Sequence, residues 1–394
     1  MKKITFFLLY FSEGAPIGFI WWCLPVLLKD QGFSLAEIST VSSIATIPWI
    51  IKFLYAPFVD IISFKFLSLK KQLVIYQLVM GTSLFFLQDA LHSESLSFLI
   101  TILCLHGVFA ALQDICIDAL VIRSIPNGDL GKMNGILQSG MLVGRSIFGG
   151  AGVFIAAKLG VNYLVVFLML SVFVSLIFLA ASKIQETKLP NRTVREYLYD
   201  LKAVLARVSF WMLIIITYFA GFSYNGISTI GSALLKELGA SAQIHATTYS
   251  LFIPISMSLG ALIWGRWSDR LPAAKVLIAA IASTAVVSIT VGLGLDIKLP
   301  LTVLILLYVI FYFFIGGCTA SLYSFLMKHT KKEFAALEFS LFMGVVNLCD
   351  SNASYLTGQL TESFSYTVNT IILGSISLCA LPLLIKCRFT VNKS

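Results

Sequence analysis

The sequence has few charged residues and no long polar region. Of its 394 residues, only 12% are Asp, Glu, Lys or Arg, whereas a soluble domain carries about 25%. The mean hydropathy is +0.92, and no stretch the size of a soluble domain interrupts the apolar runs. These deficits exclude an ordinary soluble protein, and we infer an integral membrane protein.

Patterns for metal, nucleotide or nucleophile chemistry are also missing. The seven cysteines form no C-x-x-C pair, and the four histidines form no H-E-x-x-H, so we expect neither a metal site nor a disulfide framework. The chain contains no G-x-x-x-x-G-K-[ST] phosphate loop and no G-x-S-x-G. We therefore expect no cofactor, no ATP hydrolysis and no enzyme activity; an intramembrane acyltransferase or protease remains the alternative from another class.

Apolar runs of about 20 residues, the length that crosses a hydrocarbon core, recur along the whole chain. The basic, apolar start "MKKITFFLLYFSEG" lacks a clear cleavage site, so we interpret it as a first span that is retained. The all-α chain should cross the bilayer twelve times. The predicted spans are 4–28, 36–58, 71–90, 96–122, 133–157, 161–182, 208–230, 241–265, 274–295, 300–327, 334–360 and 365–386.

The net charge of +9 is distributed unevenly over the loops that these spans define. The loops after odd-numbered spans hold four lysines, whereas the other loops, the two termini and the span ends that adjoin them hold 22 of the 28 basic residues. The positive-inside rule therefore predicts a multi-pass protein of the bacterial inner membrane with both termini in the cytoplasm. Because topology explains the charge, nucleic acid is not an expected partner.

The longest polar stretch, 183–207, divides the chain into six spans and six. We predict an N-terminal six-helix bundle at 1–182, a cytoplasmic linker at 183–207 and a C-terminal six-helix bundle at 208–394. The linker places Leu198, Leu201, Leu205 and Val208 on one helical face. This periodicity predicts an amphipathic helix at the membrane interface.

A weak internal repeat supports the division. "APFVD" (56–60) ends the second span and "GRWSDR" (265–270) ends the eighth, with Asp60 and Asp269 separated by 209 residues. Two six-span halves with repeated topology indicate a transporter, with its substrate near the midplane.

Several stretches resemble a known family. "GRWSDRLPAAK" (265–275) resembles the loop signature of the major facilitator superfamily. "YFSEGAPIG" (10–18), "IPWIIKFLYAPFVD" (47–60) and "LQDICID" (112–118) resemble AmpG-type muropeptide permeases and acetyl-coenzyme A transporters. "LPVLLKDQGFSLAEI" (24–38) is similar to siderophore permeases. The resemblance implies the major facilitator fold of two six-helix halves.

Charges within the spans are candidate site residues, because an unpaired charge in a bilayer costs several kcal/mol. Glu13, followed by Gly14 and Pro16, is our first choice for carrying a proton, with Asp114 as a second. Lys52 and Arg145 are candidate contacts for an anionic substrate, although Lys52 could instead reach the interface. In the second half, Asn225, Asn347 and Asp350 are candidate substrate contacts.

The remaining acidic residues are candidates for a gate on the cytoplasmic side of the transporter. Asp118 lies five residues before Arg123, near the predicted cytoplasmic end of its span and at the depth of Asp60. In the superfamily, acids at such positions pair with loop cations and helix ends to close the cytoplasmic side. The resemblance therefore implies gate roles for Asp60, Asp118, Asp269 and Arg270. His106 could be a proton relay or a structural hydrogen-bonding group.

Together these features predict a secondary active transporter that imports a bulky, polar, anionic solute in symport with protons by alternating access. A siderophore or a muropeptide is the expected small-molecule substrate; a coenzyme A ester or a drug is the alternative, and a transporter-like receptor without flux stays open. The expected partners are the substrate, protons and the lipid bilayer, and we expect a monomer.

Overall fold

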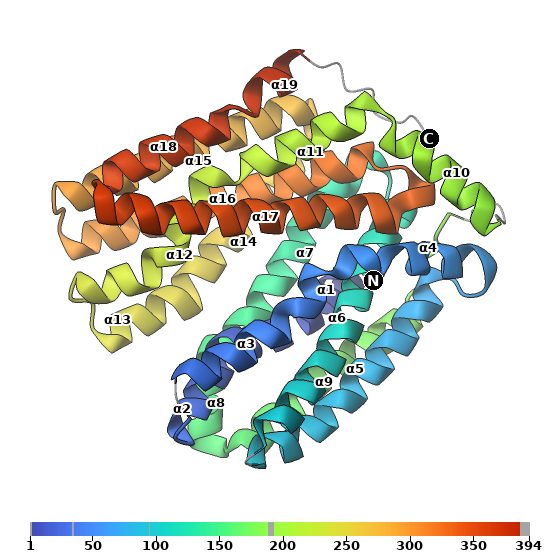
Figure 1. Ribbon diagram of the computed structural model, residues 1–394, viewed down its shortest axis with the longest axis horizontal. Coiled ribbons are helices and arrows are strands. Elements are labelled where there is room, and N and C mark those ends of the chain that lie inside the picture. Colours follow the sequence, from blue (N-terminus) through green and yellow to red (C-terminus); the bar gives the residue numbers. More distant parts are fainter. Residues whose placement is uncertain (1, 34, 94, 188–192, 387–394) are drawn as a thin grey trace. The chain divides into compact units, whose positions relative to one another are not determined.

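A computed structural model describes residues 2–33, 35–93, 95–187 and 193–386, and this part of the chain is helical without any strand (Figure 1). Eleven helices are long and apolar enough to cross a membrane, or twelve if one bent pair counts as a single span. The expected all-α architecture is confirmed. The predicted spans agree with these helices to within a few residues at most of their ends.

The described residues divide into two compact units, each with long helices lying side by side. Unit 1 comprises residues 1–124, 136–194 and 332–340, and unit 2 comprises 125–135, 195–331 and 341–394. Each unit thus includes a short segment from the other half of the sequence. The predicted boundaries at 182 and 208 do not anticipate these two segments, and remain predictions for the bundles themselves.

The helices of the first half include both long spans and short pieces. They are α1 (Lys2–Gly18), α2 (Leu24–Asp30), α3 (Leu35–Ile50), α4 (Ala56–Lys65), α5 (Leu69–His92), α6 (Leu96–Ser124), α7 (Leu130–Arg145), α8 (Ala151–Leu159) and α9 (Val161–Ala181). Within unit 1, α5 packs against both α6 and α9, and α3 packs against α6.

The second half repeats this plan after the linker helix α10. Its helices are α10 (Val194–Leu205), α11 (Val208–Ala220), α12 (Phe222–Glu237), α13 (Ala242–Thr247), α14 (Ile253–Arg270), α15 (Ala273–Asp296), α16 (Leu301–His329), α17 (Ala335–Ser363), α18 (Tyr366–Leu378) and α19 (Leu381–Lys386). Within unit 2, α16 packs against α14 and α15, and α15 packs against α18.

The second span is bent. The helical stretches 44–50 and 52–65 meet at 45°, and a single 3₁₀ turn, Lys52–Leu54, lies at the break. Pro48 lies just before this break, and proline removes a backbone donor and clashes with the preceding turn. The bend therefore places Lys52 on an irregular turn rather than inside a regular helix.

Helices α1 and α7 approach each other closely through glycines. A Cβ atom added to Gly14 would lie 2.2 Å from the carbonyl oxygen of Met141, and one added to Gly144 would lie 2.4 Å from that of Phe11. Small residues allow such backbone contact in membrane helices. A π-helical turn follows each helix, Phe19–Cys23 after α1 and Ser146–Gly150 after α7, and the two turns contact each other.

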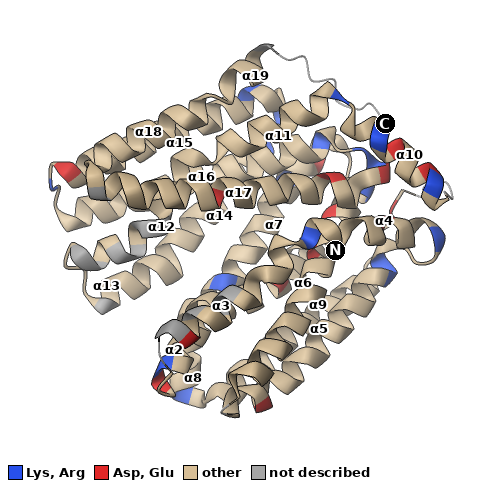
Figure 2. Ribbon diagram, viewed as in Figure 1, with Lys and Arg blue, Asp and Glu red and all other residues tan. Residues whose placement is uncertain are grey.

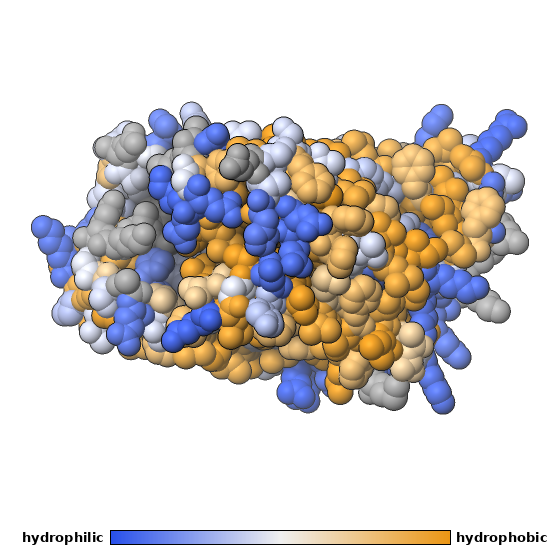
Figure 3. Space-filling view, turned by 90° about the horizontal axis from the view of Figure 1, so that it is seen from below, coloured by the Kyte–Doolittle hydropathy of each residue, from blue (hydrophilic) through white to orange (hydrophobic). Residues whose placement is uncertain are grey.

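Surface chemistry agrees with a lipid environment. Large apolar side chains are exposed on the long helices, including Phe85 (58% exposed) and Ile177 (65% exposed). Charged residues gather mainly near helix ends (Figure 2). The face in Figure 3 is largely hydrophobic, with hydrophilic side chains in separate clusters. Hydrocarbon contact explains such exposure, which water would disfavour.

Candidate functional site

A cluster of buried ionisable side chains occupies the interior of unit 1, and we call it the α1–α6 cluster. It joins residues of α1 and α6 to the turn at the bend of the second span. Its members are Tyr10, Glu13, Lys52, Asp114 and Asp118, each at most 8% exposed. Three acids and one base in a buried site place opposing charges under strong mutual influence, because little water screens them.

Two short contacts organise the cluster. Lys52 Nζ lies 2.5 Å from Asp114 Oδ2, and the Tyr10 hydroxyl donates to Asp118 Oδ1 at 2.5 Å. Asp114 and Asp118 are one helical turn apart, so both point from the same face of α6. Lys52 and both aspartates were candidates from the sequence, and the structure brings them together; Tyr10 was not a candidate.

Glu13 is the member of the α1–α6 cluster whose hydrogen-bonding capacity is least used. It is 2% exposed, and its Oε2 atom has no hydrogen-bond partner among the residues that the structure describes. Asp114, Lys52, Asp118 and Arg145 all act on it electrostatically. A buried polar atom without a partner is uncommon and marks a site that a proton or a ligand can complete.

Arg145 is the last residue of α7 and lies beside the cluster. A Cβ atom on Gly18 would meet the Arg145 carbonyl oxygen at 2.4 Å, which shows how closely the two helix backbones pass. The Arg145 Cζ atom lies 5.2 Å from the centre of the Trp21 ring, a cation–π distance. Arg145 as a whole is half-buried, and the planar fork of its guanidinium suits a carboxylate or phosphate.

A second network surrounds Asp60, whose side chain is completely buried in unit 1. Arg123 Nη2 lies 2.7 Å from Asp60 Oδ1. The same carboxylate accepts from the backbone amides of Ala336 (3.4 Å) and Leu337 (3.1 Å) at the start of α17. A carboxylate at a helix N-terminus is favourable because the amides there lack helical partners.

Asp269 forms the matching network in unit 2. Its carboxylate accepts from the amides of Gly131 (2.8 Å) and Lys132 (2.7 Å) in the first turn of α7, and Lys328 Nζ lies 3.1 Å from Asp269 Oδ1. Each network thus combines an aspartate, a cation and a helix N-terminus. Asp269 follows Asp60 by 209 residues, and Lys328 follows Arg123 by 205.

The two cations were missed by the sequence reasoning, although a signal was present. Arg123 and Lys328 both occupy the last turn of a long span, α6 and α16. Their spacing is close to that of the two aspartates. Extending the repeat from the acids to the bases would have identified both residues.

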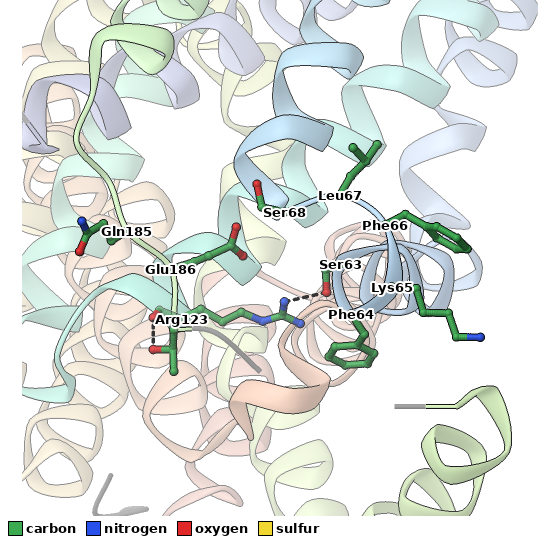
Figure 4. Close-up of a pocket in the computed structure, with 10 residues that line it drawn as sticks. Ser63, Phe64, Lys65, Phe66, Leu67, Ser68, Arg123, Gln185 and Glu186 are labelled. Carbon is green, nitrogen blue, oxygen red and sulfur yellow. Dashed lines mark hydrogen bonds between the residues drawn. The ribbon is translucent and has the colours of Figure 1, made fainter. Parts of the chain in front are cut away.

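Arg123 also forms one wall of a cavity of about 670 Å³ (Figure 4). Its Nε atom donates to the Lys332 carbonyl (2.9 Å), and its Nη1 atom donates to Ser63 Oγ (2.8 Å). The other lining residues belong to the end of α4, to the α4–α5 connection and to the non-helical segment after α9. They are Ser63, Phe64, Lys65, Phe66, Leu67, Ser68, Gln185, Glu186 and Thr187.

The segment after α9 ties three helix ends together. The Thr187 amide and hydroxyl both donate to the Arg123 carbonyl at the end of α6 (3.1 and 2.7 Å). Glu186 accepts from Ser68 and from the amides of Leu69 and Lys70 at the start of α5. Burial raises the pKa of the Glu186 carboxyl, while Arg123 and these donors oppose the rise. We call residues 182–187 the strap.

The other predicted site residues are not brought into these networks by any contact that can be described. Asn225 is buried (8% exposed), and its Nδ2 atom lies 3.7 Å from Cys349 Sγ. Asn347 and Asp350 are exposed on α17, and Arg270 is exposed at the end of α14. His106 is buried in unit 1, with its Nδ1 atom 3.1 Å from Ser83 Oγ. Their roles remain predictions.

Among the described residues, no group of three or more His, Cys, Asp or Glu side chains could hold a metal ion. Two helical units with membrane-length spans, buried ion pairs and paired helix-end networks define a polytopic membrane protein of the transporter class. A model of the Major Facilitator Superfamily matches residues 5–351 and 220–392. The chain belongs to the Major Facilitator Superfamily, and it is a transporter rather than an enzyme.

Relatives and solved structures agree with this assignment. A protein of Rickettsia conorii named "Putative transporter AmpG 4" is 22% identical over 99% of this chain and 97% of its own length. A Rickettsia felis protein of the same name is 23% identical over 66% of this chain and 62% of its own length.

The solved structures share the fold at low sequence identity. The proton:xylose symporter XylE is 12% identical, with a TM-score of 0.75 over 98% of this chain and 94% of its own. A bacterial homologue of the iron transporter ferroportin, in an outward-facing state, is 16% identical, with a TM-score of 0.74 over 98% and 99% of the two chains.

Proposed function

We propose that this protein is a proton-coupled importer of the bacterial inner membrane that moves a bulky, polar, anionic solute by alternating access, as a monomer with both termini in the cytoplasm. The observation that carries the proposal is the α1–α6 cluster. It holds Glu13 with an unpartnered oxygen beside a buried ion pair. Buried ionisable residues in membrane spans are costly, and proton relays are one function that explains them.

In this proposal the roles of the charged residues differ. Glu13 carries the proton, because a carboxyl group can titrate. Arg145 holds an anionic group of the substrate, because a guanidinium keeps its charge throughout the cycle. Lys52 is paired with Asp114, so it can contact the substrate only if that pair opens. Protonation of Asp114 would release Lys52 and thereby link proton uptake to substrate binding.

The two aspartate networks act as the cytoplasmic gate in this proposal. Asp60 and Asp269 each hold the N-terminus of a helix and pair with a cation. Charge-assisted hydrogen bonds of this kind are strong when water is excluded. Opening the gate requires these bonds to break, and the contact between Asp118 and Tyr10 is a further bond that we assign to it.

Two substrates have specific support. The blocks at 10–18, 47–60 and 112–118 resemble AmpG-type permeases, and a relative that carries the AmpG name matches along 99% of the chain. Both favour a muropeptide. The similarity of residues 24–38 to siderophore permeases favours a siderophore. A coenzyme A ester is the third candidate, and all three offer anionic groups to Arg145.

Transport by the purified protein in proteoliposomes tests the proposal. With an inward proton gradient, we expect accumulation of a labelled muropeptide or ferric siderophore. Glu13→Gln should abolish accumulation but keep counterflow, because exchange needs no net proton movement. Arg145→Ala should weaken binding by about 2–5 kcal/mol and reduce both assays. Lys275→Gln, at an exposed site in the first turn of α15, is the matched control.

Equal loss of accumulation and counterflow in both variants would contradict the division of roles. Normal substrate binding by Arg145→Ala would contradict the anionic-substrate part. If accumulation by the unaltered protein ignores the proton gradient, proton coupling is wrong.

A further inference from the structure

The linker helix α10 carries apolar side chains on two sides. Tyr197 (1% exposed) and Val204 (0% exposed) are buried against the protein. Leu198 (51% exposed), Tyr199 (76% exposed) and Leu205 (37% exposed) remain open. Helix α10 therefore has two apolar faces, and the rest of the protein covers only one of them.

The C-terminal end of α10 is held next to a membrane-spanning helix. Only Ala206 and Arg207 separate it from α11, and two residues reach at most about 7 Å. The indole nitrogen of Trp211, in the first turn of α11, donates to the Leu205 carbonyl at 2.7 Å. Because α11 begins a membrane span, the C-terminal end of α10 must lie at the membrane boundary.

Charge is segregated around α10. Arg195 and Lys202 lie three residues before and four residues after Leu198, so all three share one face. Both cations are exposed. The acids Glu196 and Asp200 are one turn apart on a different flank. The open face thus combines two cations with three exposed apolar side chains.

We propose that the open face of α10, formed by Arg195, Leu198, Tyr199, Lys202 and Leu205, binds the surface of an anionic phospholipid bilayer. The apolar side chains enter the boundary between headgroups and acyl chains, and the cations contact the lipid phosphates. Lysine and arginine extend their charged ends to that depth while their stems cover apolar surface. The occupant is the membrane in which the protein resides, so the inference does not depend on what the protein transports.

Hydrogen–deuterium exchange of the full-length protein in nanodiscs tests this assignment. We expect amide exchange in residues 194–205 to be slower in discs containing 30% phosphatidylglycerol than in discs of phosphatidylcholine alone. Each cation near an anionic surface should contribute about a fivefold effect on binding, which high salt should reduce. Inorganic phosphate added to the phosphatidylcholine discs should have no effect.

The double variant Arg195→Gln/Lys202→Gln should lose most of the lipid dependence. The control variant Lys65→Gln/Lys275→Gln removes two other exposed cations and should keep it. Leu198→Ser/Tyr199→Ser should exchange faster in both kinds of disc. Equal exchange of α10 in both lipids would overturn the proposal, as would a lipid effect that survives in the Arg195→Gln/Lys202→Gln variant.

Discussion

At the scale of single residues, buried ion pairs have the clearest consequences for the stability of the protein. The Asp60 and Arg123 side chains are 0% and 2% exposed, so removing one leaves the other without its main partner in a region of low dielectric constant. The loss of one member of such a pair costs far more than the pair contributes, because the remaining ion has lost its hydration.

We therefore expect Arg123→Gln to lower the free energy of unfolding by roughly 3–5 kcal/mol. Arg123→Lys should restore only part of it, because one ammonium group cannot reproduce the planar fork that reaches Asp60, Ser63 and Lys332. Thermal or denaturant unfolding in detergent measures the effect. Lys65→Gln, an exposed change in the same unit, should stay within about 0.5 kcal/mol; a similar loss in both variants would contradict the argument.

Glu186 gives a prediction about pH, because burial raises the pKa of its carboxyl above the ordinary 4.5. A raised pKa means that the folded state binds this proton more tightly than the unfolded state does. The associated stability is fully present below pH 4.5 and is lost as the pH rises through the folded-state pKa. Glu186→Gln should remove this dependence, measured as melting temperature against pH.

A control separates the proton from the hydrogen bonds. Glu186→Ala leaves the amides of Leu69 and Lys70 without the acceptor that they have now, so it should be less stable than Glu186→Gln at every pH. If the glutamine variant keeps the pH dependence of the unaltered protein in this window, another group is responsible.

At the scale of helices, close packing of α1 on α7 positions Glu13 and Arg145. Gly144→Ala would place a methyl group about 2.4 Å from the Phe11 carbonyl oxygen, and backbone cannot move aside as a flexible side chain can. We expect a loss of roughly 1–3 kcal/mol in stability, measured by unfolding in detergent. Gly128→Ala is the control, because nothing lies within 4 Å of an added Cβ there. Equal stability of the two variants would show that the contact is not tight.

The spans were predictable because a helix that crosses a bilayer needs about 20 apolar residues, and runs of that length are visible in the sequence. The exact surroundings of Lys52 were not, because the bend after Pro48 and the reach to Asp114 depend on contacts 62 residues apart in the chain. The same holds for Tyr10, which looks like one more aromatic residue in an apolar run until Asp118 is placed beside its hydroxyl. Hydropathy thus predicts helices, whereas the partner of a buried charge depends on how those helices pack.

At the scale of the whole molecule, the charge bias predicts the orientation of every loop. A fluorescent protein joined after Lys183 should fold and fluoresce, because that loop is predicted to be cytoplasmic. The same reporter joined after Lys298 should stay dark, and a periplasmic phosphatase should give the opposite pattern at both sites. The reverse result at both sites would place both termini outside the cytoplasm.

The partners of Asp60 are synthesised at different times after Asp60 itself. The amide of Ala336, which helps to hold Asp60, is 276 residues later in the chain. At a synthesis rate of about 5–20 residues per second, the ribosome needs on the order of 14–55 s to reach it. Arg123 is only 63 residues away and emerges several times sooner. The arginine is therefore available to neutralise the aspartate while the later helices are still being made, and it shortens the period in which a lone carboxylate must be accommodated by the membrane.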